Sequence, residues 1–303
     1  MRSWPRLSRA MTQTKAILIA GPTASGKSAM ALKLARERGG VVVNADSMQV
    51  YAELEILSAR PTLEEMGGVA HRLYGHVAIA EGYSVGRFVR EAEAMLAEVT
   101  AAGQVPIFVG GTGLYLKALL EGLSPIPAIP PAIREHWRAE ADRLGASKLH
   151  RRLAEMDPGT AARLSPTDPQ RIVRALEVMD ATGRPLWEWQ QEPGTPLIRT
   201  EDTERLVVMP ERAALHARSD ARFDEMMARG ALDEARRIME LDLDPALPGM
   251  RALGLRPLMA HLRGEMALED AVDEGKAETR RYIKRQATWI SGNMKSWKAV
   301  SAQ

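Results

Sequence analysis

The chain has 303 residues, of which 45% are hydrophobic and 26% charged, with a formal net charge of +2 and no cysteine. Without cysteine, disulfides, thiolate zinc sites and thiol nucleophiles are excluded, and no apolar run approaches the roughly 20 residues of a membrane helix. The nearly neutral charge provides no global field that would attract nucleic acid, so only local charge clusters can do so.

The beginning of the chain and its strand pattern predict an α/β fold. Residues 1–14 are basic but have no apolar core of signal-peptide length, so we expect a disordered tail, with Met11 as an alternative start. Runs of β-branched and apolar residues predict buried strands at 16–20, 41–45, 106–110 and 205–209. Between them lie helical patterns, such as the one that follows the predicted N-cap Ser84 and ends at Gly103. This alternation is typical of a parallel sheet flanked by helices.

A second region begins where prolines cluster in "LSPIPAIPPAIREHW". The following pattern is purely helical, with helix starts predicted at Asp157-Pro158 and at Asp168-Pro169 and a stop near Gly183. We therefore expect an all-helical insertion domain at 123–195. The core domain would then comprise residues 15–122 and 196–303, including C-terminal helices.

The segment "GPTASGKS" at 21–28 fits the pattern G-x-x-x-x-G-K-S between a predicted strand and a predicted helix. Backbone N–H groups of such a loop and the positive end of the helix hold a di- or triphosphate. Lys27 would add a cation, and the Ser28 hydroxyl would be a ligand for Mg²⁺. The alternative is a tight turn with an exposed lysine.

A carboxylate follows the second predicted strand in "VVVNADSMQVY". Most P-loop enzymes need an Asp at a strand end to organise Mg²⁺, but the strand at 106–110 runs into "GGTG" instead. Asp46 would lie at the carboxyl edge of the sheet, where ligands bind in open α/β folds. It is either the N-cap of the next segment or a general base for a polar planar ligand held by Ser47, Gln49 and Tyr51.

Further polar residues lie on the loop at 110–115 and on predicted helices. Thr112 belongs either to a flexible turn or to a second oxygen-binding loop. Gln170 and Arg174 share a helix face, which is either solvated or a set of phosphate and base donors. Arg222 lies four residues after Arg218. It either forms a surface pair with Asp224 or Glu225, or faces the P-loop and neutralises a departing diphosphate.

The C-terminal run from 276 to 298 holds seven Lys or Arg and one Glu. It places Arg281, Lys284, Arg285 and Thr288 on one side of a helix, which is either a solvated face or a surface that follows a phosphate backbone, with Trp289 and Trp297 nearby for stacking. The histidines show no metal-ligand spacing, so a zinc site is not expected.

Five segments in this order resemble the bacterial tRNA dimethylallyltransferase family: "GPTASGKS", "NADSMQVY", "GGTGLYLKALLEGLSP", "DPQRIVRALEV" and "KRQATW". The similarity spans about residues 15 to 292. It implies a P-loop NTPase-like core with a helical insertion, and transfer of a dimethylallyl group from dimethylallyl diphosphate to N6 of adenosine 37 in tRNAs that decode codons beginning with U. The implied cofactor is Mg²⁺, and the implied RNA partner is the anticodon stem-loop.

The resemblance also assigns roles to individual residues. It implies catalytic roles for Asp46 as the general base, Thr23, and Arg222 as a ligand of the diphosphate. The implied diphosphate site consists of Gly21, Pro22, Thr23, Ala24, Ser25, Gly26, Lys27 and Ser28, with Ser28 also at the metal. The implied tRNA contacts are Asp46, Ser47, Met48, Gln49, Thr112, Arg134, Gln170, Arg171, Ile172, Val173 and Arg174, and the C-terminal helix would add Arg281, Lys284 and Arg285.

The chain departs from the family pattern at "LEILSARP" and "HRLYGHV", which lie outside the core chemistry. The alternatives are an isopentenyltransferase acting on free AMP or ATP, a small-molecule P-loop kinase, and a nucleotide-gated RNA-binding module without catalysis. We expect a cytoplasmic monomer that has no membrane partner.

Overall fold

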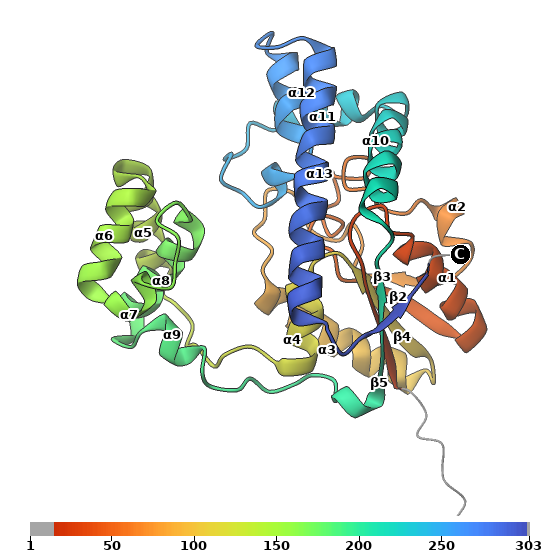
Figure 1. Cartoon of the computed structure of the whole chain (residues 1–303), viewed down its shortest axis with the longest axis horizontal. Coiled ribbons are helices and arrows are strands. Elements are labelled where there is room, and N and C mark those ends of the chain that lie inside the picture. The colour runs from red at the N-terminus through yellow and green to blue at the C-terminus, as the bar shows by residue number, and fades with distance from the viewer. Residues whose placement is uncertain (1–14, 302–303) are drawn as a thin grey trace, which may run out of the picture. The chain divides into compact units, whose positions relative to one another are not determined.

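The computed structural model describes residues 15–301, so the expectations for the tail at 1–14 and for Met11 lie outside the described residues. The chain divides into two compact units (Figure 1). Unit 1 contains the residues up to 120 and those from 197 on, and unit 2 is Glu121–Pro196. That the predicted insertion at 123–195 is a separate domain remains our proposal, and each unit is described by itself.

Unit 1 is built on a six-stranded parallel sheet of order β3-β2-β4-β1-β5-β6. The strands are β1 Ala16–Ala20, β2 Gly40–Asn44, β3 His71–Arg72, β4 Val105–Gly110, β5 Thr203–Val208 and β6 Lys298–Val300. The four predicted strands and the parallel α/β class are confirmed. The edge strands β3 and β6 were not predicted, and β6 follows the expected C-terminal helices. Such short segments become strands through pairing with a neighbour, which local sequence does not encode.

Both faces of this sheet are covered by apolar side chains. Along β1, Ile17 and Ile19 pack on one face with Ala31 and Ala35 of the first helix, whereas Leu18 packs on the other. Strands buried on both faces are continuously apolar, which explains why the central strands were recognisable from sequence.

Some helices of unit 1 pack on the sheet and others pack mainly on one another; the longest is α13, drawn in blue in Figure 1. It packs against α10 and α12. Ser84 caps α3 by accepting the Arg87 amide, as predicted. Besides the short 3₁₀ turns at Thr200–Asp202 and Gly249–Arg251, the helices are α1 Lys27–Arg38, α2 Leu63–Met66, α3 Val85–Ala101, α4 Gly113–Glu121, α10 Arg212–Ala228, α11 Ala231–Glu240, α12 Leu255–Leu262 and α13 Leu268–Asn293.

Unit 2 contains only helices, as expected. Asp157 and Asp168 cap α7 and α8 by accepting the amides of Thr160 and Arg171, so these predicted helix starts are confirmed. The unit has its own apolar core. Its helices are α5 Pro131–Leu144, α6 Ala146–Met156, α7 Pro158–Ala161, α8 Pro169–Thr182 and α9 Leu186–Trp189. None of the helices within residues 15–301 has the length and apolar character that crossing a membrane requires.

A buried carboxylate organises the loop that follows β2. Glu234 of α11 is only 2% exposed. Its carboxylate accepts three consecutive backbone N–H groups, from Glu55, Ile56 and Leu57, at 2.9, 2.8 and 2.9 Å. These bonds replace the hydrogen bonds to water that the buried carboxylate has lost. They fix the segment "LEILSARP", which differs from the family pattern, against α11.

Replacing this carboxylate by an amide is expected to destabilise unit 1. Glu234→Gln removes the charge and one of the two acceptor oxygens, so at least one buried N–H loses its partner, which costs about 1–3 kcal/mol. Urea unfolding monitored by circular dichroism measures the loss. The matched control is Glu240→Gln, an exposed glutamate on the same helix, for which we expect a change below about 0.5 kcal/mol. Equal stability of the two variants would contradict the capping role.

Candidate active site

The loop between β1 and α1 has the geometry of an anion site. Gly26 precedes α1 with φ of +88°, in the left-handed region that glycine tolerates, and no side chain caps the helix. The first amides of α1 are therefore available to an external acceptor, and the positive end of the helix dipole points the same way. This arrangement supports the phosphate-binding interpretation of 21–28 over the tight-turn alternative.

Lys27 is the cation of this loop. Its Nζ donates to the backbone oxygen of Pro22 at 3.3 Å. Burial lowers the pKa of Lys27 to about 8, while the nearby Asp46 raises it in part and Arg222 lowers it further. Lys27, Asp46 and Arg222 therefore lie close enough for their charges to interact.

Arg222 reaches the same region from α10. Burial lowers the pKa of its guanidinium, opposed by Glu65, Glu225 and Asp46. Within residues 15–301, no hydrogen bond or ion pair engages this guanidinium, whereas Asp224 beside it pairs with Lys276 at 2.6 Å. Arg222 therefore does not form the alternative surface pair with Asp224. A half-buried guanidinium without such a pair is suited to an anionic ligand.

Asp46 lies two residues beyond β2, at the carboxyl edge of the sheet. Asn44 holds its backbone by accepting from the Asp46 amide at 2.8 Å and donating to the Asp46 carbonyl at 3.0 Å. The Asp46 Oδ1 accepts the Met48 amide at 2.9 Å in a turn. No helix starts here, since the next one, α2, begins at Leu63, so the helix N-cap alternative is wrong. Oδ2 makes no hydrogen bond within the described chain and is available as a proton acceptor.

The second glycine loop lies directly beside this turn. The Thr112 Oγ1 accepts the Ser47 amide at 3.0 Å and donates to the Ser47 Oγ at 3.3 Å. The structure therefore brings together two predicted segments that are far apart in sequence. Gln49, in contrast, uses its amide nitrogen to hold the carbonyls of Ser58 and Ala59 at 3.1 and 2.8 Å, so this donor has a structural role.

Aromatic side chains surround Asp46. Burial raises the pKa of Tyr74, Tyr115 and Tyr282, and the charge of Asp46 raises each of them further. These phenols remain neutral at physiological pH. Tyr115 also stacks on Phe88, with ring centroids 4.4 Å apart. The surroundings of the carboxylate therefore include neutral aromatic rings as well as the cations Lys27 and Arg222.

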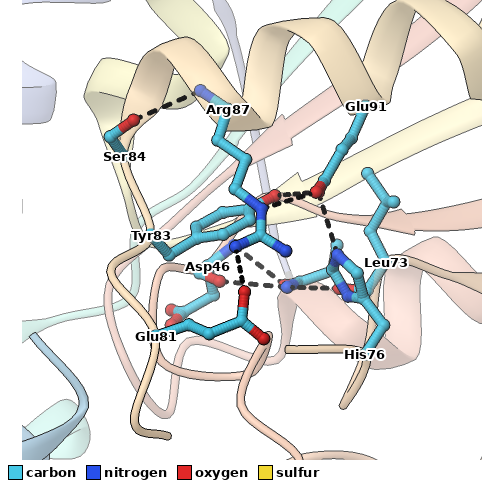
Figure 2. A network of polar contacts seen from close by, with 9 residues as sticks. Asp46, Leu73, His76, Glu81, Tyr83, Ser84, Arg87 and Glu91 are labelled. Carbon is cyan, nitrogen blue, oxygen red and sulfur yellow. Dashed lines mark hydrogen bonds and ion pairs between the residues drawn. The ribbon is translucent and has the colours of Figure 1, made fainter. Parts of the chain in front are cut away.

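A polar network fixes the segment that passes the same edge of the sheet (Figure 2). The Glu91 carboxylate accepts from Tyr83 at 2.6 Å and contacts His76 and Arg87 at 2.9 Å each. Burial disfavours the charge of Glu91, but these three hydrogen bonds outweigh it and lower its pKa. The network anchors the segment "HRLYGHV" to α3. Asn44 also ties this segment to the site, because its amide donates to the carbonyls of both Leu73 and Asp46 at 3.0 Å.

Gln286 is a site residue that sequence analysis missed. It is 5% exposed, and its Oε1 accepts from both the amide and the hydroxyl of Thr23, at 2.9 and 3.2 Å. Its Nε2 donates to the Gly111 carbonyl at 3.1 Å. The missed signal was a polar residue in the apolar stripe of Ile283 and Ile290, because a buried amide at such a position requires partners.

The predicted RNA-binding residues of unit 2 differ in exposure. Arg134, Gln170 and Arg171 are exposed, and Arg174 pairs with Glu177 at 3.2 Å. Ile172 is 0% exposed in the core of the unit. Its side chain cannot reach RNA, because it packs among the helices.

The exposed side of α13 carries basic groups. Arg281, Lys284 and Arg285 are exposed, Arg281 pairs with Glu274 at 2.6 Å, and the Arg285 guanidinium lies 5.4 Å from the ring centre of Tyr282. The predicted basic side of this helix is therefore accessible, while Gln286 on its buried side contacts the P-loop.

For a metal, the donors near the loop are limited. No cluster of three or more His, Asp or Glu side chains suitable for a metal occurs in the described chain. The Ser28 hydroxyl is exposed in the first turn of α1. Mg²⁺ commonly uses one or two protein oxygens together with phosphate oxygens and water, so this single hydroxyl beside an anion site fits such an ion.

Comparisons with known proteins all point to one family. The model of the IPP transferase family matches residues 49–293. A tRNA dimethylallyltransferase of Bradyrhizobium sp. is 55% identical over 276 residues, covering 91% of this chain and 90% of that protein, and one of Rhizobium meliloti is 50% identical over 286 residues, covering 94% of each.

Solved structures agree with this result. The full-length tRNA isopentenylpyrophosphate transferase from Bacillus halodurans has a TM-score of 0.68 at 32% identity, covering 96% of this chain and 90% of that one. A eukaryotic dimethylallyltransferase acting on tRNA has a TM-score of 0.82 at 29% identity, covering 96% of this chain and 74% of that one.

Binding of inorganic pyrophosphate is expected to weaken as the pH rises through about 8. Below this pH, Lys27 in the free protein already carries the proton that pairs with the anion. Above it, binding must take up a proton, so the affinity falls by up to about tenfold per pH unit. Calorimetric titrations between about pH 6.5 and about 9.5 measure this dependence.

The matched control for this pH dependence is Lys27→Arg, whose guanidinium stays charged throughout the range. The ionisation of pyrophosphate itself cancels in the ratio of the two affinities. The ratio of wild-type to variant affinity should fall above about pH 8. A ratio independent of pH would contradict the lowered pKa of Lys27.

Proposed function

The chain belongs to the IPP transferase family, and from this premise we propose that it transfers a dimethylallyl group from dimethylallyl diphosphate to the N6 amine of adenosine 37 in tRNAs that decode codons beginning with U. Diphosphate is the second product. The observation that carries the proposal is the meeting of two half-buried cations with one carboxylate at a P-loop, since Lys27, Arg222 and Asp46 influence one another's charge.

The leaving diphosphate is bound by the loop from Gly21 to Ser28. The free amides of α1 and the Lys27 ammonium compensate the charge that develops on the leaving oxygen. Arg222 adds a guanidinium from α10, the helix that follows β5. Preorganised donors of this kind act where charge appears in the transition state, which lowers the barrier. Thr23 lies at the entrance of the loop as a third proposed catalytic residue.

The transfer balances with Asp46 as the base. The N6 nitrogen forms a bond to the terminal allylic carbon while the bond between that carbon and the diphosphate oxygen breaks, and its electron pair leaves with the diphosphate. The proton released from N6 goes to the Asp46 Oδ2, which carries no other hydrogen bond within residues 15–301. Positioned proton acceptors typically contribute about 10²–10⁴ to the rate.

We assign the RNA contacts to two groups of residues, of which the basic residues of α13 and Arg134, Gln170 and Arg171 are exposed and the others are half-buried or contribute their backbone. In unit 1 these are Ser47, Met48 and Thr112 near the carboxylate, together with the basic side of α13 at Arg281, Lys284 and Arg285. In unit 2 they are Arg134, Gln170, Arg171 and Arg174, with the backbone at Ile172 and Val173. The partner is the anticodon stem-loop, whose target base must leave its stack to reach Asp46.

Mg²⁺ is the proposed cofactor. The Ser28 hydroxyl would hold it, and the ion would supply positive charge for the leaving group. We also propose a monomer that acts in the cytoplasm, where tRNA is found.

The alternatives fit the site less well. A P-loop kinase would need a carboxylate at the end of a strand next to β1, but β4 continues into Gly111 and Thr112. An enzyme for free AMP or ATP would use the same loop and base, yet it would have no use for the exposed basic side of α13. A nucleotide-gated RNA-binding module would not need a carboxylate beside the anion site.

The reaction class can be tested by labelling. We expect radiolabelled dimethylallyl diphosphate to label tRNA but neither AMP nor ATP when each is incubated with the protein and Mg²⁺. A label on AMP or ATP would favour the free-nucleotide enzyme. Absence of label on all three would refute transfer and favour the kinase or the binding module.

The role of Asp46 can be tested with the isosteric variant Asp46→Asn. The amide still accepts the Met48 amide but cannot take a proton, so single-turnover prenylation should fall by about 10²–10⁴ while the affinity for tRNA stays within about threefold. Asp273→Asn, an exposed aspartate on α13, serves as the matched control. Turnover of Asp46→Asn near the wild-type rate would exclude Asp46 as the base.

A further inference from the structure

A single buried amide connects the two glycine loops of the site. We infer that Gln286 is a positioning residue for the transfer, which sets the P-loop and the catalytic carboxylate in register by holding Thr23 and Gly111 together. This inference rests on the proposed function for its meaning in catalysis. That Gln286 holds the two loops together follows from its hydrogen bonds alone.

The hydrogen bonds of Gln286 use both ends of its amide. Oε1 accepts from the Thr23 amide at 2.9 Å and from the Thr23 hydroxyl at 3.2 Å, and Nε2 donates to the Gly111 carbonyl at 3.1 Å. The bond to Gly111 fixes which end faces the P-loop, because exchanging the two ends would set a donor against the Thr23 amide. The orientation of the Thr23 hydroxyl is therefore set by a residue more than 260 positions away in sequence.

The contact leaves no room for adjustment. A Cβ atom on Gly111 would lie 2.1 Å from the Gln286 Nε2, and one on Gly113 would lie 2.0 Å from the Trp289 ring. Only a chain without side chains at these positions lets α13 approach the loop so closely. The same hypothetical atom on Gly111 would be 3.5 Å from the Asp46 Oδ2, so Gly111 lies between the amide and the proposed base.

Packing alone does not explain an amide at this position. The neighbouring side chains on the buried side of α13, Ile283 and Ile290, are 1% and 3% exposed and apolar. An amide withdrawn from water costs free energy unless each polar atom is bonded, so an aliphatic residue would pack at least as well. A carboxylate would accept from Thr23 equally, but it could not donate to Gly111 and would put negative charge beside an anion site. A neutral amide meets both requirements.

The same helix carries the exposed basic residues Arg281, Lys284 and Arg285. Gln286 is therefore the point where the proposed RNA-binding helix contacts the diphosphate loop. Loss of this contact should impair the alignment of the reactants without removing any group that touches them. Misalignment of this kind can reduce a rate about 10²-fold.

A double-mutant cycle between Gln286 and Thr23 tests the inference. Gln286→Met has a similar length but no polar amide, and Thr23→Val removes the hydroxyl at nearly constant volume. We expect each single variant to lower the single-turnover prenylation rate by about 10- to 100-fold. If Gln286 acts through Thr23, the double variant is at most about threefold slower than the slower single variant, whereas independent residues would multiply their effects.

Two further measurements separate positioning from other roles. The affinity for tRNA, measured by filter binding, should stay within about threefold in Gln286→Met. A parallel fall in tRNA affinity and rate would overturn the inference in favour of a direct RNA contact, as would full multiplication of effects in the double variant. Gln104→Met is the matched control, because Gln104 is exposed at the amino end of β4, opposite the site. Its rate should equal that of the wild type.

Affinity for inorganic pyrophosphate keeps the test independent of the proposed function. Measured by calorimetry, the affinity of Gln286→Met for pyrophosphate should be at least about threefold lower than that of the wild type. Adding Thr23→Val to this variant should lower the affinity little further. If the wild type does not prenylate tRNA, the proposed function is refuted. The pyrophosphate affinities of the single and double variants still test whether Gln286 positions the P-loop. Unchanged pyrophosphate affinity in Gln286→Met overturns this positioning role. Should Gln286→Met not fold by circular dichroism, the uncharged Gln286→Leu takes its place with the same expected fall in affinity.

Discussion

Two half-buried cations beside one carboxylate are the constraint on which this site depends. Burial lowers the pKa of both Lys27 and Arg222, and Asp46 is the carboxylate that acts on each of them. Charges withdrawn from water are costly unless they are compensated. Glu65 and Glu225 also act on Arg222, but within residues 15–301 neither Lys27 nor Arg222 forms an ion pair. We propose that an anionic ligand completes this site, and a diphosphate suits the amides and cations of the loop. Such a site binds its leaving group more tightly as negative charge develops, which is what a transferase needs.

The parallel sheet makes this arrangement possible. The loops after β1, β2 and β4 meet at the same edge because the carboxyl ends of parallel strands lie together, and β4 separates the other two. The P-loop and Asp46 thus face each other across the loop of Gly111 and Thr112. Gln286 of the long helix α13 (Figure 1) bonds to the P-loop at Thr23 and to the neighbouring loop at Gly111.

Much of this could be predicted from sequence, and the failures have physical reasons. The central strands were recognisable because both of their faces are buried, and the helix starts at Ser84, Asp157 and Asp168 because capping is a local interaction. The strand β6 was missed because its pairing with β5 is not local. The family resemblance grouped Ile172 with its polar neighbours as an RNA contact, but the core of unit 2 buries its side chain.

The sequence by itself determined the P-loop, the candidate carboxylate at Asp46 and the family, since each is a contiguous motif whose chemistry is carried by neighbouring residues. Only the tertiary structure decided that Asp46 starts no helix, that Gln49 supports a loop, and that Glu234 and Gln286 bond backbone groups far away in the chain. Hydrogen bonds between distant segments depend on how the chain returns to the same edge of the sheet. That return is set by packing and strand order, which no local pattern of residues contains.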